Sequence, residues 1–237
     1  MAFHGYTVLA VVPARGGSKG IPGKNLKAIR GQSLVARAAR TIVESRVVDR
    51  AVCSTDDPKI AAEAERSGLI VPELRPEALA RDDSRSIDVW RHVWRDIERR
   101  DQRHYDVSIL VEPTSPLRRP DDLRRTLAAL LENNAKAAAT VSPTPSHYAP
   151  HKTLTIGGDG RIGFYRSDGA QFARRQDIPP YFHRNGACYA AWRETILEHG
   201  TILDDDCVAV VLDRPLVNID EPEDLAVAEF FARSEAW

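Results

Sequence analysis

Two rhythms of apolar and polar positions alternate along the chain. Short runs of β-branched and aliphatic residues predict strands, which cover residues 6–12, 50–55, 69–74, 106–112 and 136–142. Between these runs, apolar residues recur with the period of an amphipathic helix over residues 32–45, 58–68, 85–100 and 120–134. Strands that alternate with helices in this way predict an α/β fold, in which a mainly parallel sheet has helices on both faces.

The alternation is interrupted after residue 142. Residues 143–185 mix arginine, proline and aromatic residues, and a hairpin is predicted over 153–165, where Gly158, Asp159 and Gly160 form the turn. The chain then returns to regular structure, with strands predicted over 186–191, 206–213 and 216–220 and a helix over 222–233. We therefore expect residues 1–237 to form one domain, with residues 143–185 inserted as an excursion from its sheet.

Composition narrows the classes of function. The 33 basic and 34 acidic side chains give a net charge of −1, so bulk charge provides no attraction to nucleic acid polymers or anionic membranes. The three cysteines lie far apart and form no CxxC pair, which argues against thiolate metal sites and fits a cytoplasmic protein. No apolar run is long enough to cross a membrane, and the first residues lack the pattern of a secretory signal.

The strand over 6–12 runs directly into VPARGGSKGIPGKN, residues 12–25, which we call the opening loop. It has neither the Walker A pattern nor the GxGxxG spacing of dinucleotide-binding folds. Glycines that free backbone N–H groups, together with Arg15, Lys19 and Lys24, favour an anion of several charges, such as a triphosphate. The alternative is a surface loop with incidental charge, but Pro13 and Pro22 stiffen the segment more than such a loop requires.

Three further polar segments accompany predicted elements. Glu112 and Thr114 lie at the end of the strand over 106–112. Asp220 ends the strand over 216–220, where its carboxylate can reach a metal, although capping of the next helix is the better interpretation when the segment is taken alone. Arg75, Ser84 and Ser86 precede or begin the helix over 85–100, and there too a serine N-cap is favoured over a functional role.

Taken together, these segments resemble one family. In order along the chain they read PARGGSKGIPGKN, CSTDD, LRPEALARDDSRSID, EPTSPLR, RRQDIPP, RNGACY and NIDEPEDL. Their order and spacing are similar to those of acylneuraminate cytidylyltransferases, which activate sialic acids, and the resemblance covers about residues 6–230. It implies a Rossmann-like nucleotidyltransferase sheet and an enzyme that transfers CMP from CTP to a 2-keto-3-deoxy acidic sugar, with release of pyrophosphate and with Mg²⁺ as cofactor.

The resemblance also implies roles for individual residues. The catalytic residues would be Arg15, Lys24 and Asp220, of which Asp220 would also bind the metal beside Asn218. Nucleotide contacts would come from Ala14, Gly16, Gly17, Lys19, Asn25, Arg75 and Ser86. The acceptor would meet Glu112, Thr114, Arg175, Asn185 and Tyr189. Family members are homodimers whose excursion reaches the partner, so residues 143–185 are expected to form a dimerisation arm with aromatic contacts.

Two positions depart from the family pattern. Asn218 stands where sialic acid enzymes usually have a first aspartate, so the metal site has one charge fewer and a non-catalytic, CTP-binding homologue is an alternative. Glu112 replaces the usual glutamine that faces the sugar, and a carboxylate there repels an acidic acceptor unless it is protonated or paired. Alternative acceptors to N-acetylneuraminate are therefore a different nonulosonic acid and a non-sugar phosphonate or phosphate.

Overall fold

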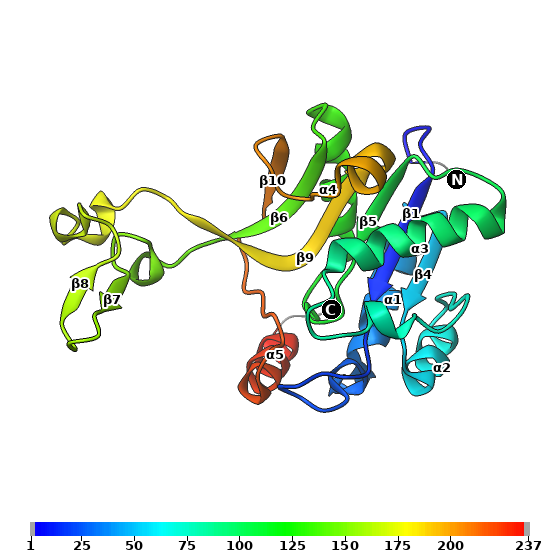
Figure 1. The fold of residues 1–237 in the computed structure, drawn as a ribbon, viewed down its shortest axis with the longest axis horizontal. Coiled ribbons are helices and arrows are strands. Elements are labelled where there is room, and N and C mark those ends of the chain that lie inside the picture. Colours follow the sequence, from blue (N-terminus) through cyan, green and yellow to red (C-terminus); the bar gives the residue numbers. More distant parts are fainter. Residues whose placement is uncertain (1–2, 235–237) are drawn as a thin grey trace.

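The computed structural model describes residues 3–234, which are built around a six-stranded sheet (Figure 1). Its strands are β1 (Val8–Pro13), β4 (Arg50–Ser54), β5 (Val107–Leu110), β6 (Ala137–Pro143), β9 (Phe182–Trp192) and β10 (Cys207–Val211), in the spatial order β10-β6-β9-β5-β1-β4. β1 is parallel to β4 and β5, and β10 is parallel to β6, whereas β9 runs antiparallel between β5 and β6. The mainly parallel sheet predicted from the sequence is confirmed.

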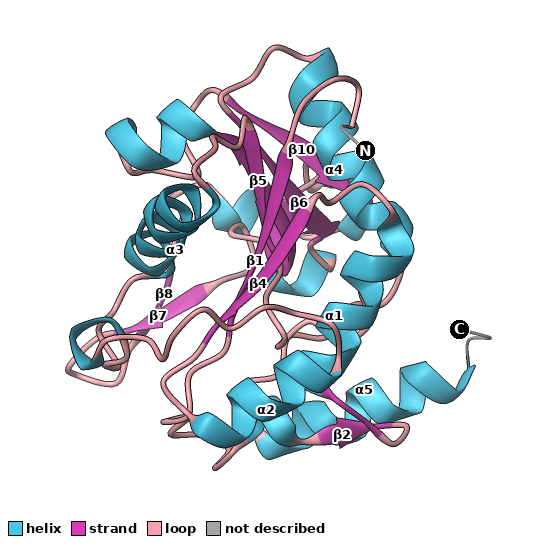
Figure 2. Ribbon diagram, turned by 90° about the vertical axis from the view of Figure 1, so that its right-hand side faces the viewer, coloured by secondary structure: helices cyan, strands magenta, loops and turns pink. Residues whose placement is uncertain are grey.

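Helices cover both faces of this sheet, also as predicted (Figure 2). One face packs against α1 (Leu34–Ser45) and α4 (Pro120–Glu132), with α2 (Pro58–Arg66) beside them, and the other packs against α3 (Ser86–Asp101). Successive residues of β1 point to opposite faces, so Ala10 and Val12 join the α1 and α4 core, whereas Leu9 and Val11 join Trp90 and Trp94 of α3. Burial on both faces explains why this strand is apolar at every position.

Short elements complete the chain. They are two hairpins, β2 (Ala28–Ile29) with β3 (Gln32–Ser33) and β7 (Leu154–Ile156) with β8 (Ile162–Phe164), and one-turn helices at Lys24–Leu26, Glu77–Leu79, Ser146–Tyr148, Gly169–Gln171, Arg175–Asp177 and Thr195–His199. The last helix is α5 (Pro222–Ser234). None of the helices in the described range is long and apolar enough to cross a membrane.

Two helices differ in how they begin. Ser33 caps α1, because its hydroxyl oxygen accepts a hydrogen bond from the Ala36 amide at 3.1 Å. The predicted cap of α3 is wrong: Arg85 occupies the N-cap position without a side-chain cap, and Ser86 is already helical. The hydroxyl of Ser86 is therefore not used to begin the helix.

Two predicted strands are absent. Residues 69–74 form only an isolated bridge, between Ile70 and Val52. Residues 216–220 form no strand and run as an irregular segment before α5. Ile219 belongs instead to a third apolar cluster, which joins the opening loop, the start of α1 and α5 through Ile21, Leu34 and Ala228. The apolar character of this segment reflects burial in that cluster, which the pattern of a short apolar run cannot distinguish from burial in a sheet.

The excursion projects away from the sheet. Residues 144–181 continue from β6, form a lobe that contains the β7–β8 hairpin, and return along β9 (Figure 1). The predicted hairpin is confirmed, whereas the strand predicted over 186–191 is longer, because β9 begins at Phe182 in the lobe itself. Several large apolar side chains of the lobe are exposed, among them Tyr148, Ile156, Ile162 and Tyr165.

Candidate active site

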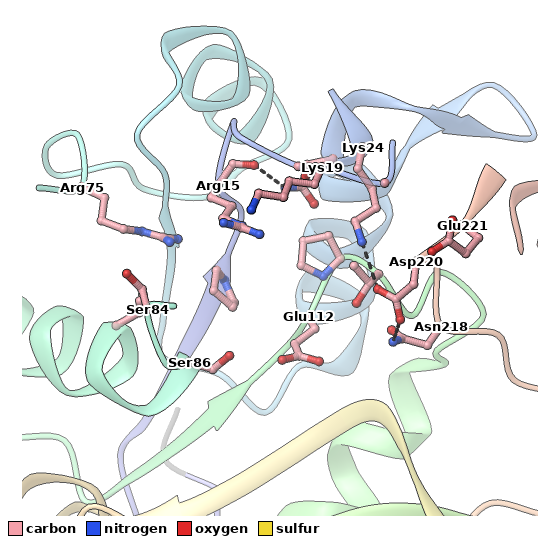
Figure 3. A pocket seen from close by; sticks show the side chains of 17 residues that line it. Arg15, Lys19, Lys24, Arg75, Ser84, Ser86, Glu112, Asn218, Asp220 and Glu221 are labelled. Carbon is pink, nitrogen blue, oxygen red and sulfur yellow. Dashed lines mark hydrogen bonds and ion pairs between the residues drawn. The ribbon is translucent and has the colours of Figure 1, made fainter. Parts of the chain in front are cut away.

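A cavity of about 510 Å³ opens at the carboxyl ends of β1, β4 and β5 (Figure 3). Four segments that were distinct in the sequence line it: the opening loop, the segment before α3, the residues after β5, and the segment before α5. The lining side chains that can carry charge or hydrogen bonds include Arg15, Ser18, Lys19, Lys24, Asn25, Arg75, Ser84, Ser86, Glu112, Thr114, Asn218, Asp220 and Glu221. This edge is where open α/β sheets bind their ligands.

The three cations of the opening loop all face carboxylates. Arg15 Nη1 lies 2.6 Å from Asp82 Oδ1, and Lys19 Nζ lies 2.5 Å from Asp82 Oδ2. Hydrogen bonds from Lys19 and Arg15 hold the pKa of the Asp82 carboxyl below its usual range. Lys24 Nζ is 3.1 Å from Asp220 Oδ1 and donates to the Ile219 carbonyl at 2.7 Å. Phosphate oxygens that approach Arg15 or Lys19 must therefore compete with Asp82.

The backbone of the opening loop is held by neighbouring segments. The buried Ala14 donates its N–H to the Ser54 carbonyl at 2.9 Å, and the Gly16 amide donates to Asp56 Oδ1 at 2.9 Å. These residues and Gly17 do not line the cavity, so in the structure they shape the loop, and their contact with a nucleotide stays a prediction. Gly20 is needed for close approach, because a Cβ there would lie 2.5 Å from the Asp220 carbonyl oxygen.

Of the residues predicted to contact the nucleoside, Arg75 and Ser86 lie across the cavity from the opening loop, whereas Asn25 belongs to that loop (Figure 3). Arg75 is buried, and its guanidinium donates to Ser54 through Nε at 2.9 Å and through Nη2, and to the Leu79 carbonyl at 3.4 Å. Burial lowers the pKa of Arg75 below its ordinary value. Asn25 Nδ2 donates to the Arg15 carbonyl at 2.9 Å. Arg75 and Asn25 thus hold the walls in place as well as lining them, and Ser86 adds a hydroxyl.

The segment before α5 carries the oxygen atoms suited to a cation. Asn218 Nδ2 donates to Asp220 Oδ2 at 2.8 Å, and the Asp220 and Glu221 amides donate to Asp224 Oδ2 at 2.9 and 2.8 Å. Asp220 therefore does not cap α5: its carboxylate faces Asn218 and Lys24, and the amides before the helix are bound by Asp224, which lies in the first turn of α5. Within residues 3–234 no group of three or more His, Cys, Asp or Glu side chains is placed to bind a metal. A carboxylate and an amide oxygen nevertheless suit Mg²⁺, which keeps several waters.

Glu112 lies where the first cavity meets a second one. It lines the first, and with Ser86 it also lines a cavity of about 370 Å³ that includes Leu110, Arg184 and Tyr189. Burial raises the pKa of the Glu112 carboxyl above its ordinary value, although nearby Arg118 and Arg184 oppose this shift. Burial likewise raises the pKa of Tyr189 to about 12, so its phenol is neutral at physiological pH.

A bulge in β9 brings this strand close to the cavities. Ala139 of β6 pairs with Tyr189, but Val141 pairs with Arg184, so two steps along β6 correspond to five along β9. Gly186 takes a φ of +69° within the bulge, and a Cβ there would lie 3.2 Å from Glu112 Oε2 and 3.4 Å from Asn218 Oδ1. Any side chain at this position would enter the site.

The comparison with known families decides the assignment. The family model described as cytidylyltransferase matches residues 9–203, which is most of the chain. The protein belongs to the cytidylyltransferase family.

Relatives of this cytidylyltransferase share nearly its full length. It is 30% identical over 230 residues to the CMP-N,N'-diacetyllegionaminic acid synthase of Legionella pneumophila, a match that covers 94% of each chain. It is 28% identical over 223 residues to a pseudaminic acid cytidylyltransferase of Campylobacter jejuni, covering 93% of this chain and 94% of that one. The fold is similar to that of a CMP:2-keto-3-deoxy-manno-octonic acid synthetase complexed with CTP, with a TM-score of 0.71, 18% identity, and coverage of 97% and 100%.

Two residues predicted to contact the acceptor lie outside both cavities. The Asn185 side chain is buried in the β9 bulge, where Oδ1 accepts hydrogen bonds from Thr140 at 2.7 Å and from the Ala187 amide at 3.0 Å, and Nδ2 donates to Ser142 at 3.1 Å. In this structure the Asn185 amide stabilises the bulge, and a contact between Asn185 and the acceptor stays a prediction. Arg175 is exposed in the lobe and lines neither cavity of its own chain.

Asp82 and Arg184 are functional candidates that the sequence did not indicate. Asp82 stands beside Asp83 in a run of charges, and no spacing rule distinguishes the aspartate that faces the opening loop from its exposed neighbour. Arg184 directly precedes Asn185, so its place in the second cavity depends on the bulge, which periodicity does not predict. The family pattern RNGACY was the only signal near Arg184.

We expect Asp82→Asn to bind CTP more tightly, because the neutral side chain no longer competes for Arg15 and Lys19. Two exposed ion pairs correspond to a decrease in Kd of about 3- to 10-fold, measured by calorimetric titration with CTP and Mg²⁺ at low ionic strength. The matched control is Asp83→Asn, which removes the same charge one residue away and should leave Kd unchanged. Weaker CTP binding by Asp82→Asn would show instead that Asp82 holds the two cations in their binding positions.

Proposed function

We propose that this cytidylyltransferase transfers CMP from CTP to a 2-keto-3-deoxy acidic sugar of the nonulosonic acid type and releases pyrophosphate. The observation that carries the proposal is the convergence of Arg15, Lys19 and Lys24 with Asp220 at the carboxyl edge of the sheet, beside a second cavity. Relatives at 30% and 28% identity are named for legionaminic and pseudaminic acids, which supports an acidic sugar as acceptor.

The chain's own residues would act by positioning and by neutralising charge. The acceptor hydroxyl attacks the α-phosphorus in line, a new P–O bond forms, and the bond from the α-phosphorus to the bridging oxygen breaks, so that its electrons leave with pyrophosphate. The hydroxyl proton is lost to solvent or to a nearby base. Lys24 and Arg15 would stabilise the charge that develops on the phosphoryl oxygens. No covalent intermediate with the protein is required.

A divalent cation would be bound at the segment before α5. Asp220 supplies a carboxylate, Asn218 can supply its amide oxygen, and both line the first cavity. Bound there, Mg²⁺ would neutralise part of the triphosphate charge. Asp220 is paired with Lys24 in this structure. Because the Asp220 side chain is 64% exposed, its carboxylate could release Lys24 and bind a metal, which would free Lys24 for a phosphate.

The lobe is proposed to form a homodimer contact. Its hairpin exposes Ile156 and Ile162, with 76% and 69% of their side-chain surface accessible, and such apolar exposure is typical of an interface. A partner bound there would also give Arg175 a path to the partner's site. The exposed position of Arg175 in its own chain is consistent with that role.

We expect Lys24→Ala to lower turnover by on the order of 100-fold or more, which is the loss of one charge-stabilising donor. Turnover is measured as pyrophosphate release from CTP and Mg²⁺ with a panel of 2-keto-3-deoxy sugar acids and phosphonates. Lys27→Ala serves as control, because Lys27 is an exposed lysine of the same segment that does not line the cavity. A near wild-type rate for Lys24→Ala would exclude the proposed role. CTP binding without turnover of any acceptor would favour a non-catalytic homologue.

Glu112→Gln is expected to change acceptor choice. The neutral amide no longer repels a carboxylate, so activity with N-acetylneuraminate should rise, on the order of 10-fold for a shift of 1.4 kcal/mol in binding. The readout is kcat/KM for each acid and phosphonate in the panel, compared between the wild-type and variant proteins. An unchanged preference would show that Glu112 does not select the acceptor, whereas wild-type activity on phosphonates alone would favour the non-sugar alternative.

We expect Ile156→Asp to convert the dimer to monomer, because a charge placed in an apolar interface loses its hydration without a partner. Sedimentation velocity gives the oligomeric state directly. Val43→Asp is the matched control, since Val43 is 59% exposed on α1 of the sheet domain rather than on the lobe. The assignment of the lobe fails if the wild-type protein is a monomer or if Ile156→Asp remains dimeric.

A further inference from the structure

The second cavity contains an arginine that forms no ion pair, although its charge acts on the nearby Glu112 carboxyl. Arg184 lines it, and within residues 3–234 no group forms a hydrogen bond or an ion pair with its guanidinium. The other arginine of this cavity, Arg85, is already engaged, because Nε and Nη2 donate to the two carboxylate oxygens of Asp88 at 2.9 and 3.1 Å. Arg184 is therefore the cation of the second cavity that is available to a ligand.

The surroundings of Arg184 favour an anion of a particular shape. Leu110, Ile202 and Leu203 supply apolar wall, and Tyr189 supplies a neutral phenol. In a partly apolar cavity a guanidinium binds a carboxylate through two parallel hydrogen bonds, and that geometry is more selective than the single charge of a lysine. A phosphate could form the same two hydrogen bonds with the guanidinium, so the geometry indicates an anion without deciding which one. The acidic sugar proposed above as acceptor favours a carboxylate.

The backbone holds Arg184 in a defined place. It pairs with Val141 at the last regular position before the bulge, and the neighbouring Asn185 is locked by Thr140 and Ser142. A side chain that starts from a fixed backbone position loses less freedom on binding than one on a loop. Both arginines are exposed, but Arg184 lies in a strand of the sheet, whereas Arg175 lies in a one-turn helix of the lobe.

Glu112 adds a second requirement. It lines both cavities, so it lies between the phosphate-binding cations and Arg184, and its carboxyl has no hydrogen bond or ion pair within residues 3–234. A ligand that places an anion at Arg184 presents its neighbouring atoms to Glu112. A hydroxyl or ammonium group there would donate to the carboxyl, whereas a second anion would be repelled.

We infer that Arg184 binds the carboxylate of the acceptor within the same chain that binds the nucleotide, and that Glu112 accepts a hydrogen bond from a donor next to that carboxylate. This inference rests on the proposed function and narrows the acceptor to a hydroxy acid or amino acid sugar in which the anion and a donor are adjacent. It makes Arg184, rather than Arg175, the residue that selects for the acid.

The experiment compares wild type with Arg184→Gln, Arg184→Lys, Arg175→Gln and Arg161→Gln. The probes are N-acetylneuraminate, 2-keto-3-deoxy-manno-octonate and their methyl esters, each with CTP and Mg²⁺. Arg184→Gln should raise KM for the acids at least about 10-fold, the loss expected for one charge-assisted contact, reduce the preference for acid over ester, and leave the Kd for CTP unchanged. Arg184→Lys should retain part of the preference. Arg175→Gln tests the competing assignment to the lobe, and the matched control is Arg161→Gln, at an exposed arginine of the β7–β8 hairpin that lines neither cavity, which should retain all of the preference.

The outcomes separate this inference from the proposed function. If wild type is active and Arg184→Gln keeps the same KM and the same preference for acid over ester, Arg184 does not bind the carboxylate, and a raised KM for Arg175→Gln would move that role to the lobe. If wild type releases no pyrophosphate with any sugar acid of the panel used for Lys24→Ala, the proposed function fails. Saturation-transfer NMR of N-acetylneuraminate with the CTP-bound protein then decides: a signal lost in Arg184→Gln supports the assignment, and a signal that is absent from wild type or equal in both proteins overturns it.

Discussion

The backbone of Ile219 joins three of the four segments that form the active site. Its amide donates to the Thr114 carbonyl at 2.8 Å, and its carbonyl accepts from Lys24 Nζ at 2.7 Å. Its side chain is fully buried in the apolar cluster that also contains Ile21 of the opening loop. One residue without reactive chemistry thus fixes the distance between the phosphate-binding loop, the residues after β5 and the carboxylate of Asp220. The charged groups of the site can be exposed and adaptable because this apolar junction is rigid.

The second general property of the site is its balance of charge. The cations of the opening loop form ion pairs with Asp82 and Asp220 at N···O distances of 2.5 to 3.1 Å. A third carboxylate, that of Glu112, also lines the cavity. A triphosphate brings several negative charges into this arrangement, so its binding requires the protein carboxylates to be displaced or to be offset by a cation. Affinity is then set by a difference between two sets of ion pairs rather than by the number of cations.

The fold and the presence of the cationic opening loop at the edge of the sheet could be predicted from the sequence, because both depend on local patterns. Buried parallel strands are continuously apolar, and the opening loop combines glycine, proline and fixed cations in one stretch of chain. The rest depends on partners that lie far away in sequence. The apolar residues of 216–220 pack in a third cluster instead of a sheet. The side-chain amide of Asn185 forms hydrogen bonds within the β9 bulge. Asp82 differs from the adjacent Asp83 in that its carboxylate faces the opening loop. Family resemblance supplied residue types for these positions but not their orientation.

The antiparallel strand β9 has a consequence for how such enzymes can diversify. It is a single strand from Phe182 in the lobe to Trp192 in the sheet, and it carries Arg184 and Tyr189 past the second cavity. One wall of the second cavity and the stem of the lobe are therefore one continuous piece of backbone, whereas the cations of the first cavity come from other segments. A shift of the lobe that moves β9 would therefore change the wall of the second cavity more directly than the opening loop. In this architecture the choice of acceptor could therefore change between relatives while the transfer reaction stays the same.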